Sequence, residues 1–184
     1  FLGKETNAVF TGTATHAAMQ HLPLGHAMDR EAVGVYLSGL RENGRISQEQ
    51  ELAVDREAVA WFTSEDLYRR MSSAGGRGRE LPFSYPISAP ALYQISADET
   101  VLLQGVIDAC FLENDGWTIV DYKTDRIRPG ESAQAAANRH ALQLSLYSLA
   151  LEAITGVPVK KQLVVLLSYR AVVAVLPVKA PECS

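Results

Sequence analysis

Three charged residues stand where β-strands usually carry apolar residues or threonine: Asp108, Asp121 and Lys123. They belong to the stretch GVIDACFLENDGWTIVDYKT, residues 105–124, which has the pattern of a strand, an Asp-Gly turn and a second strand. Mg²⁺ and Mn²⁺ prefer carboxylate oxygens and retain waters, one of which can act as a nucleophile. A nearby ammonium group can stabilise the charge that develops on a phosphoryl oxygen. These residue types therefore indicate a metal site beside a phosphate, with the two aspartates as ligands.

The turn predicts how the three charges are arranged across the two strands. With Asp115 and Gly116 as a two-residue turn, counting outward gives the pairs Asn114 with Trp117, Leu112 with Ile119, Cys110 with Asp121, and Asp108 with Lys123. Since side chains alternate along a strand, all three charges then lie on one face, with Asp108 diagonal to Asp121. The alternative is a salt bridge on a solvated face. The apolar residues beside both aspartates predict instead that both faces are covered, so the charges need ionic or metal partners.

The rest of the sequence predicts the elements that would position these residues. Helical patterns cover residues 11–22, 29–43 and 48–74. The last of these has a break near Thr63, where Ser64 could cap a new helix. A long helix runs from an N-cap at Ser132 to Gly156. After a glycine-rich loop at 72–80, strand patterns beyond the central hairpin cover 81–87, 92–96, 161–169 and 171–178. We therefore predict an α/β fold with a mixed central sheet flanked by helices.

Length and composition are those of one folded domain. The chain has 184 residues, of which 47% are hydrophobic and 21% are charged, so it can bury a self-sufficient core. We predict a single domain over 1–184, with a helical part at 1–74 and a catalytic sheet and helix at 80–178. No apolar run approaches the roughly 18 residues that a membrane span requires. The chain begins at Phe1 without a signal peptide, and we expect it to be a fragment of a longer protein.

Cysteine and charge content argue against several classes of protein. The two cysteines have no paired spacing that indicates a zinc site, an iron–sulfur site or a disulfide framework, which favours a reducing, cytoplasmic location. The formal net charge of −4 argues against a domain that grips duplex DNA over its whole surface, because such binding depends on phosphate neutralisation. The chain also has no Gly-x-x-x-x-Gly-Lys-[Ser/Thr] loop, the sign of a nucleotide-hydrolysing motor.

Four segments together resemble the motifs of one known family. They are GTATHAAMQHL at 12–22, GVIDA at 105–109, VDYKTD at 120–125 and QLSLY at 143–147. In this order they resemble the first helix with an inward histidine, the aspartate strand, the Asp-x-Lys strand and the Gln-x-x-x-Tyr helix of the PD-(D/E)XK nuclease superfamily. Within it, the chain resembles the RecB-like nuclease domains, in particular the C-terminal domains of the AddA helicase-nucleases. The resemblance spans most of the chain.

The resemblance implies a role for each motif residue. The metal ligands would be the side chains of His16, Asp108 and Asp121 and the main-chain carbonyl of Tyr122. Lys123 would be the catalytic lysine, and Gln143 and Tyr147, four residues apart on one helix face, would orient the site or contact DNA. Glu80, in RELPF, stands where relatives have a glutamate before a proline and an aromatic residue.

Two of these assignments have structural alternatives. His16 could be a hydrogen-bonded core histidine. Gln143 and Tyr147 could be ordinary polar positions on an amphipathic helix. The apolar face of that helix is predicted to hold Leu142, Leu146, Leu149 and Ala150.

The resemblance implies an Mg²⁺- or Mn²⁺-dependent exodeoxyribonuclease that acts in double-strand break repair and recombination. Its implied partners are single-stranded DNA, a helicase region of the same parent chain and a second, AddB-like subunit, with no membrane. Two alternatives stay open. One is a non-catalytic module that keeps the nuclease fold and binds nucleic acid or protein. The other is a metal-carboxylate hydrolase that acts on a small phosphoester.

Overall fold

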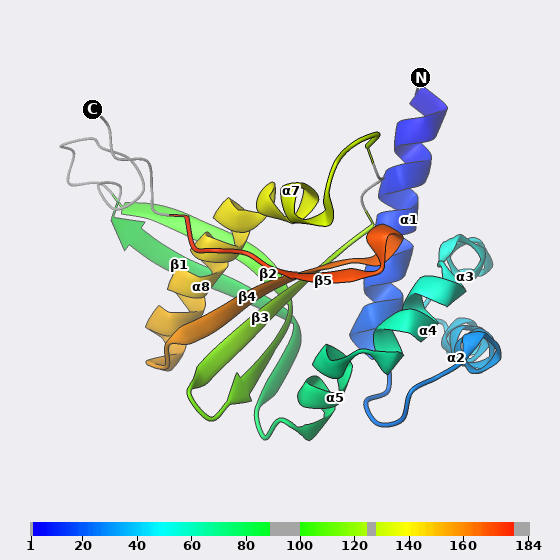
Figure 1. The fold of residues 1–184 in the computed structure, drawn as a ribbon, viewed down its shortest axis with the longest axis horizontal. Helices are drawn as coiled ribbons and strands as arrows, with labels where there is room; N and C mark the ends of the chain where they lie inside the picture. The colour runs from blue at the N-terminus through cyan, green and yellow to red at the C-terminus, as the bar shows by residue number, and fades with distance from the viewer. Residues whose placement is uncertain (1, 89–99, 125–127, 179–184) are drawn as a thin grey trace.

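The computed structural model describes residues 2–88, 100–124 and 128–178, with side chains from Phe10 onward. These residues form a mixed sheet with helices on both faces, which confirms the predicted fold class (Figure 1). The strand predicted at 92–96 lies outside the described residues.

The sheet contains five strands in the order β1-β2-β3-β4-β5. Their bounds are Arg77–Ser88, Thr100–Glu113, Gly116–Lys123, Val159–Leu166 and Ala171–Ala174. Strands β3 and β4 are parallel, and the other neighbouring pairs are antiparallel. Because parallel neighbours need a crossover, the chain between β3 and β4 forms α7 (Ala133–Asn138) and α8 (Ala141–Thr155).

Two hydrophobic cores lie on opposite faces of the sheet. The helices α1 (Leu2–His21), α2 (Arg30–Glu42), α3 (Gln48–Ala53), α4 (Arg56–Ser64) and α5 (Asp66–Ser73) gather on one face. They pack against alternate strand residues such as Phe111, Val120 and Val165. Helices α7 and α8 cover the other face, where Ile119 and Val164 are buried. The core of the sheet is therefore covered on both sides, as its apolar strand residues predict.

Several helix boundaries differ from the predictions. Helix α1 begins at Leu2 rather than at residue 11, because Gly12 is a packing residue and not a start signal: a Cβ there would lie 3.5 Å from Thr124 Oγ1. The segment 48–74 forms three helices, with Asp55 as the N-cap of α4. Ser64 does not cap α5, since its hydroxyl donates to the Trp61 carbonyl within α4. Strand β1 begins at Arg77, inside the predicted loop.

The helix predicted from Ser132 to Gly156 is interrupted. Both predicted ends are confirmed: the Ser132 hydroxyl accepts from the Ala135 N–H, and Gly156 has a φ of 70°. Between them, however, α7 ends at Asn138 and α8 starts at Ala141. The predicted apolar face of α8 is also wrong, since Leu142 and Leu149 are 51% and 45% exposed, whereas Leu144 and Leu151 are buried.

The register of the β2–β3 hairpin differs from the prediction by two residues. Glu113 pairs with Gly116, Leu112 with Trp117 and Cys110 with Ile119, so the turn consists of Asn114 and Asp115. Gly116 is instead the first residue of β3, with a φ of 147°. A Cβ at Gly116 would lie 2.3 Å from the Pro158 carbonyl oxygen, which accepts from the Trp117 N–H. Glycine is needed there for the approach of the chain that enters β4.

An offset of two residues leaves the facing of the strands unchanged, because the side-chain period of a strand is two. Continuing the observed register by one step beyond Ala109 and Val120 places Asp108 level with Asp121. The predicted pair of Asp108 with Lys123 is therefore wrong, and the two carboxylates are level instead of diagonal.

Candidate metal centre and lysine site

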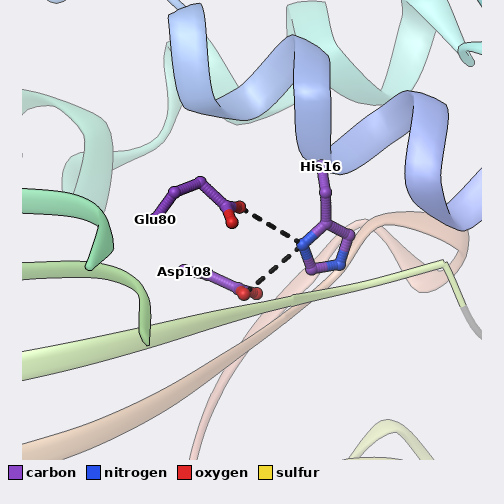
Figure 2. A group of neighbouring side chains, drawn as sticks. All are labelled: His16, Glu80 and Asp108. Atoms are coloured by element: carbon purple, nitrogen blue, oxygen red, sulfur yellow. Dashed lines mark ion pairs between the residues drawn. The ribbon is translucent and has the colours of Figure 1, made fainter. Parts of the chain in front are cut away.

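A histidine and two carboxylates from three separate elements meet at one end of α1 (Figure 2). His16 Nδ1 lies 3.4 Å from Asp108 Oδ1 and 3.7 Å from Glu80 Oε1. One ligand atom from each of the three residues lies within 4.8 Å of the other two, and no other such group of three occurs in the described part of the chain. One imidazole and two carboxylates are suitable donors for a divalent cation.

Strands β1 and β2 both change their facing at this cluster. On β2, Ile107 belongs to the core under α8, whereas Ala109 belongs to the core under the N-terminal helices. Between them lies Asp108, level with Glu80, whose φ of 45° is unusual for a residue with a side chain. Such a conformation costs on the order of 1–3 kcal/mol and is found most often at functional sites. It presents the Glu80 carboxylate to His16.

Helix α1 is tied directly to the strand that carries Glu80. The Arg79 guanidinium donates to the main-chain carbonyls of Gln20 and Leu22, at 3.1 and 2.5 Å, at the C-terminal end of α1. These contacts satisfy carbonyl groups that have no partner within the helix. They also fix the distance between His16 and the β1 strand.

Asp108 links the cluster to the next strand. Its Oδ2 accepts a hydrogen bond of 2.8 Å from the Tyr122 main-chain N–H, directly beside Asp121. Asp121 itself does not belong to the group of three, so the predicted sharing of one ion by Asp108 and Asp121 stays a prediction. The predicted role of the Tyr122 carbonyl also stays a prediction.

The two oxygens of Asp121 have different surroundings. Oδ1 accepts from Lys123 Nζ at 2.9 Å, whereas Oδ2 is buried without a hydrogen-bond partner among the described residues. A buried carboxylate oxygen that lacks a donor is costly, and the side chain is almost fully enclosed. Burial, with a further contribution from Asp108, raises the pKa of Asp121 to about 6. This orphan oxygen is a position that a bound cation would satisfy.

The other ionisable groups show the same excess of negative charge. The hydrogen bond to Asp108 raises the pKa of His16. Burial and the neighbouring Asp108 raise the pKa of Glu80. Both directions are those expected where carboxylates are crowded with little compensating positive charge.

A chain of side chains leads from Asp121 onto α8. Lys123 Nζ is 3.4 Å from Gln143 Oε1, and Gln143 Nε2 donates to the Tyr147 hydroxyl at 2.9 Å. The predicted facing of Gln143 and Tyr147 toward each other on one helix face is therefore found. These two residues contact the lysine, not the group of His16, Glu80 and Asp108.

Sequence reasoning foresaw most members of the site but left Glu80 without a role. The positive φ at Glu80 brings its carboxylate to His16, and neither glycine nor a turn pattern in RELPF indicates that conformation. The only signal was the position of Glu80 in a motif-like segment.

Comparisons with known proteins agree with this geometry. Residues 3–180 match the family model described as the PD-(D/E)XK nuclease superfamily. Three similar proteins are each named as the A-type component of an ATP-dependent helicase/nuclease. They come from Desulforamulus reducens, with 36% identity over 84% of this chain; Geobacillus kaustophilus, with 38% over 80%; and Bacillus licheniformis, with 34% over 86%. The chain spans only 12–14% of the length of these relatives. Within the described residues, no helix is long and apolar enough to cross a membrane.

Proposed function

This chain belongs to the PD-(D/E)XK nuclease superfamily, and from that premise we propose that it hydrolyses phosphodiester bonds of DNA with Mg²⁺ or Mn²⁺. The observation that carries the proposal is the buried, unpartnered Asp121 Oδ2 beside Lys123, one residue from the main-chain N–H that holds Asp108. Unpaired carboxylate oxygens and an imidazole at the meeting point of three strands and a helix have no evident structural use.

The donor set fits a divalent cation. Asp108, Asp121 and His16 would hold it, with the Tyr122 carbonyl as a further ligand, and Glu80 is placed to join them. When bound, the cation would neutralise phosphate charge and activate the attacking water. Oxygen donors favour Mg²⁺ and Mn²⁺ over softer metals, and one imidazole is compatible with Mn²⁺.

The residues around the cation would have separate tasks. Lys123, held by Asp121 and Gln143, presents its ammonium group where negative charge develops on a phosphoryl oxygen. Tyr147 orients the Gln143 amide. Asp121 would therefore serve both the cation and the lysine, through different oxygens.

The test is cleavage of a labelled single-stranded oligonucleotide with Mg²⁺, with Mn²⁺ and with a chelator. We expect fragments only with a metal, and no fragments from the Asp121→Asn variant. The matched control is Asp115→Asn, which alters an exposed carboxylate in the hairpin turn and should cleave like the natural chain. Metal binding without cleavage would favour a non-catalytic module. Cleavage of a chromogenic phosphodiester but not of DNA would favour a small-phosphoester hydrolase.

We further propose that the chain is the nuclease region of a longer helicase-nuclease of the AddA type. The relatives carry a helicase/nuclease name, and the match covers only a small part of their length. In such a parent, a helicase region would deliver DNA strands to the site, together with an AddB-like partner protein, during double-strand break repair. The test compares degradation of duplex DNA by the parent complex with and without ATP. We expect ATP-dependent degradation that the Asp121→Asn substitution abolishes.

A further inference from the structure

Two aromatic rings occupy the space above Gly105 on β2. Phe83 pairs with Gly105 across β1 and β2, and the Phe83 and Tyr147 rings meet edge to face with centroids 5.2 Å apart. A Cβ at Gly105 would lie 2.8 Å from Tyr147 Cε1 and 2.9 Å from Phe83 Cε1. Side-chain carbons do not approach this closely, so any larger residue would displace at least one ring. The absence of a side chain at Gly105 thus allows Tyr147 its position.

The Tyr147 hydroxyl determines how the Gln143 amide is turned. Because that hydroxyl accepts from Gln143 Nε2, the amide oxygen is directed to the opposite side, toward Lys123 Nζ. The lysine then has two acceptors, Gln143 Oε1 and Asp121 Oδ1. A lysine side chain has many rotamers, and two fixed acceptors restrict its ammonium group to one place.

We propose that Gly105 is a positioning residue for Lys123, acting through Tyr147 and Gln143. The inference rests on the proposed function, because it concerns the lysine of the same site. The bland interpretation of the pair is that Phe83 merely covers a glycine in a sheet, as aromatic residues often do. That interpretation predicts a loss of stability in Gly105 variants, but no specific effect on the lysine.

The first experiment measures kcat and KM for a single-stranded oligonucleotide, together with Mn²⁺ affinity. We expect Gly105→Ala to lower kcat about tenfold while KM and the Mn²⁺ dissociation constant change less than about twofold, because the lysine and not the ligands is displaced. The matched control is Gly39→Ala in α2, where a Cβ would have no neighbour within 4 Å. This control should retain the kcat of the natural chain. An unchanged kcat in Gly105→Ala, or an equal loss of Mn²⁺ affinity, would overturn the proposal.

A double-mutant cycle separates positioning from general damage. Tyr147→Phe keeps the ring against Phe83 but removes the hydroxyl, so we expect a loss of kcat similar to that of Gly105→Ala. In the Tyr147→Phe background, Gly105→Ala should lower kcat by less than about a further twofold, since the same link is already broken. Additive losses would contradict the proposal. If Gly105→Ala does not fold, Tyr147→Phe alone still decides, because an unchanged kcat would show that the hydroxyl does not act through the lysine.

A readout without activity keeps this inference distinct from the proposed function. The side-chain NH₂ signals of Gln143 in a ¹⁵N–¹H spectrum should shift in Gly105→Ala and in Tyr147→Phe, but not in Gly39→Ala. If the natural chain shows no metal-dependent cleavage, the proposed function fails, while these shifts still support the link from Gly105 to Gln143. Unshifted Gln143 signals in Gly105→Ala would overturn the inference even if the chain is an active nuclease.

Discussion

Asp121 and Lys123 lie two residues apart on β3, yet their chemical tasks differ. Asp121 offers one oxygen to the lysine and leaves the other buried and unpartnered, whereas Lys123 contacts only acceptors. A carboxylate can ligate a cation, and an ammonium group cannot. Substitutions at the two positions should therefore separate metal affinity from turnover.

We predict that Lys123→Ala lowers kcat about 10²–10³-fold and leaves Mn²⁺ affinity nearly unchanged, because a lost charge-stabilising donor costs that much in transition-state stabilisation. Asp121→Ala should remove both cleavage and most of the Mn²⁺ affinity. Calorimetric Mn²⁺ titration and single-turnover cleavage measure the two quantities. An equal loss of Mn²⁺ affinity in both variants would show that Lys123 has a structural role.

Glu80 allows a prediction about backbone strain, since its φ is 45°. Glu80→Gly should be more stable than Glu80→Ala by about 1 kcal/mol, because glycine adopts positive φ without steric cost. Both variants should bind Mn²⁺ more weakly than the natural chain. Thermal unfolding and Mn²⁺ titration measure these effects.

Arg170 provides the control for this prediction. It also has a positive φ, 49°, but it lies after the last turn of η1 (Leu167–Tyr169), outside the group of His16, Glu80 and Asp108. Arg170→Gly should likewise be more stable than Arg170→Ala, with Mn²⁺ affinity unchanged. If Glu80→Gly is no more stable than Glu80→Ala, the strain at Glu80 is absent.

Residue types alone predicted part of this site. The charges at Asp108, Asp121 and Lys123 indicated metal and phosphate chemistry because charged residues are unfavourable inside covered strands. The approach of His16 to Asp108 could be expected only through the family resemblance, since 92 positions separate them and helix packing decides their distance. The part played by Glu80 depends on a backbone conformation that its neighbours in sequence do not indicate.

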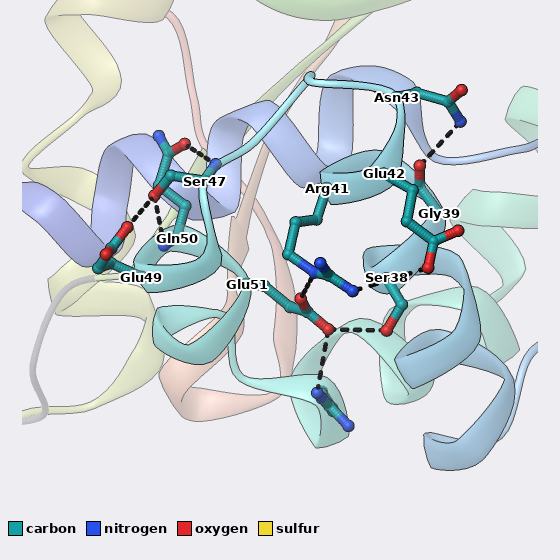
Figure 3. Close-up of polar contacts among 10 residues, drawn as sticks. Ser38, Gly39, Arg41, Glu42, Asn43, Ser47, Glu49, Gln50 and Glu51 are labelled. Carbon is teal, nitrogen blue, oxygen red and sulfur yellow. Dashed lines mark hydrogen bonds and ion pairs between the residues drawn. The ribbon is translucent and has the colours of Figure 1, made fainter.

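At the scale of elements, buried charge also fixes the helices that carry no candidate site residue. Glu51 on α3 is buried and accepts from Ser38 and Arg41 of α2, while Arg56 of α4 lies 3.7 Å away (Figure 3). The Ser38 hydrogen bond and the two arginines lower its pKa. A capping box between Ser47 and Gln50 starts the same helix. This network joins α2, α3 and α4 into the layer against which α1 packs.

A second carboxylate, Glu113, ties the β2–β3 hairpin to its surroundings. Arg70 of α5 donates two hydrogen bonds to it, and Thr118 and Lys161 donate one each. The Arg70 guanidinium, ahead of the other donors, lowers the pKa of Glu113 from 4.5 to about 2. A depressed carboxyl pKa stabilises the fold above the unfolded-state value, and this contribution is lost as the pH falls toward the folded-state value.

We predict that Glu113→Gln lowers the free energy of unfolding by about 1–2 kcal/mol at neutral pH, the size expected for charged hydrogen bonds at a partly exposed site. The difference from the natural chain should persist down to pH 4.5 and shrink between pH 4.5 and about 2. Denaturant unfolding at a series of pH values measures it, with Asp115→Asn in the same hairpin as the control. A difference that grows as the pH falls would contradict the assignment.

Element boundaries followed the sequence where the signals were local and failed where they were not. The Ser132 cap and the Gly156 end depend on contacts within a few residues, and both were predicted correctly. Helix α2 was predicted within one residue at each end. The hairpin register was wrong because the backbone at Gly116 is set by the Pro158 carbonyl, 42 positions later in the chain. The exposed leucines of α8 were misassigned because two strands, and not one, determine which helix face is buried.

At the scale of the whole molecule, the net charge of −4 limits how strongly the chain can hold DNA. Some of its cations are already engaged within the fold. Arg70 and Lys161 pair with Glu113, and Arg79 is bound to the end of α1. Few phosphate contacts remain available, so DNA binding should be weak and sensitive to salt.

We predict that the chain cleaves single-stranded DNA slowly, without ATP, and cleaves duplex DNA more slowly still. Each contact with a single-strand phosphate contributes about −0.7 to the slope of log affinity against log salt, so two to four contacts imply a loss of roughly 7- to 50-fold between 50 and 200 mM salt. In a longer parent, a motor would replace this weak capture by delivering strands at high effective concentration. The measurement is cleavage of matched single- and double-stranded oligonucleotides over a salt series, with and without ATP. Rapid, salt-insensitive cutting of blunt duplex would show that the chain grips DNA unaided, and that delivery by a motor is unnecessary.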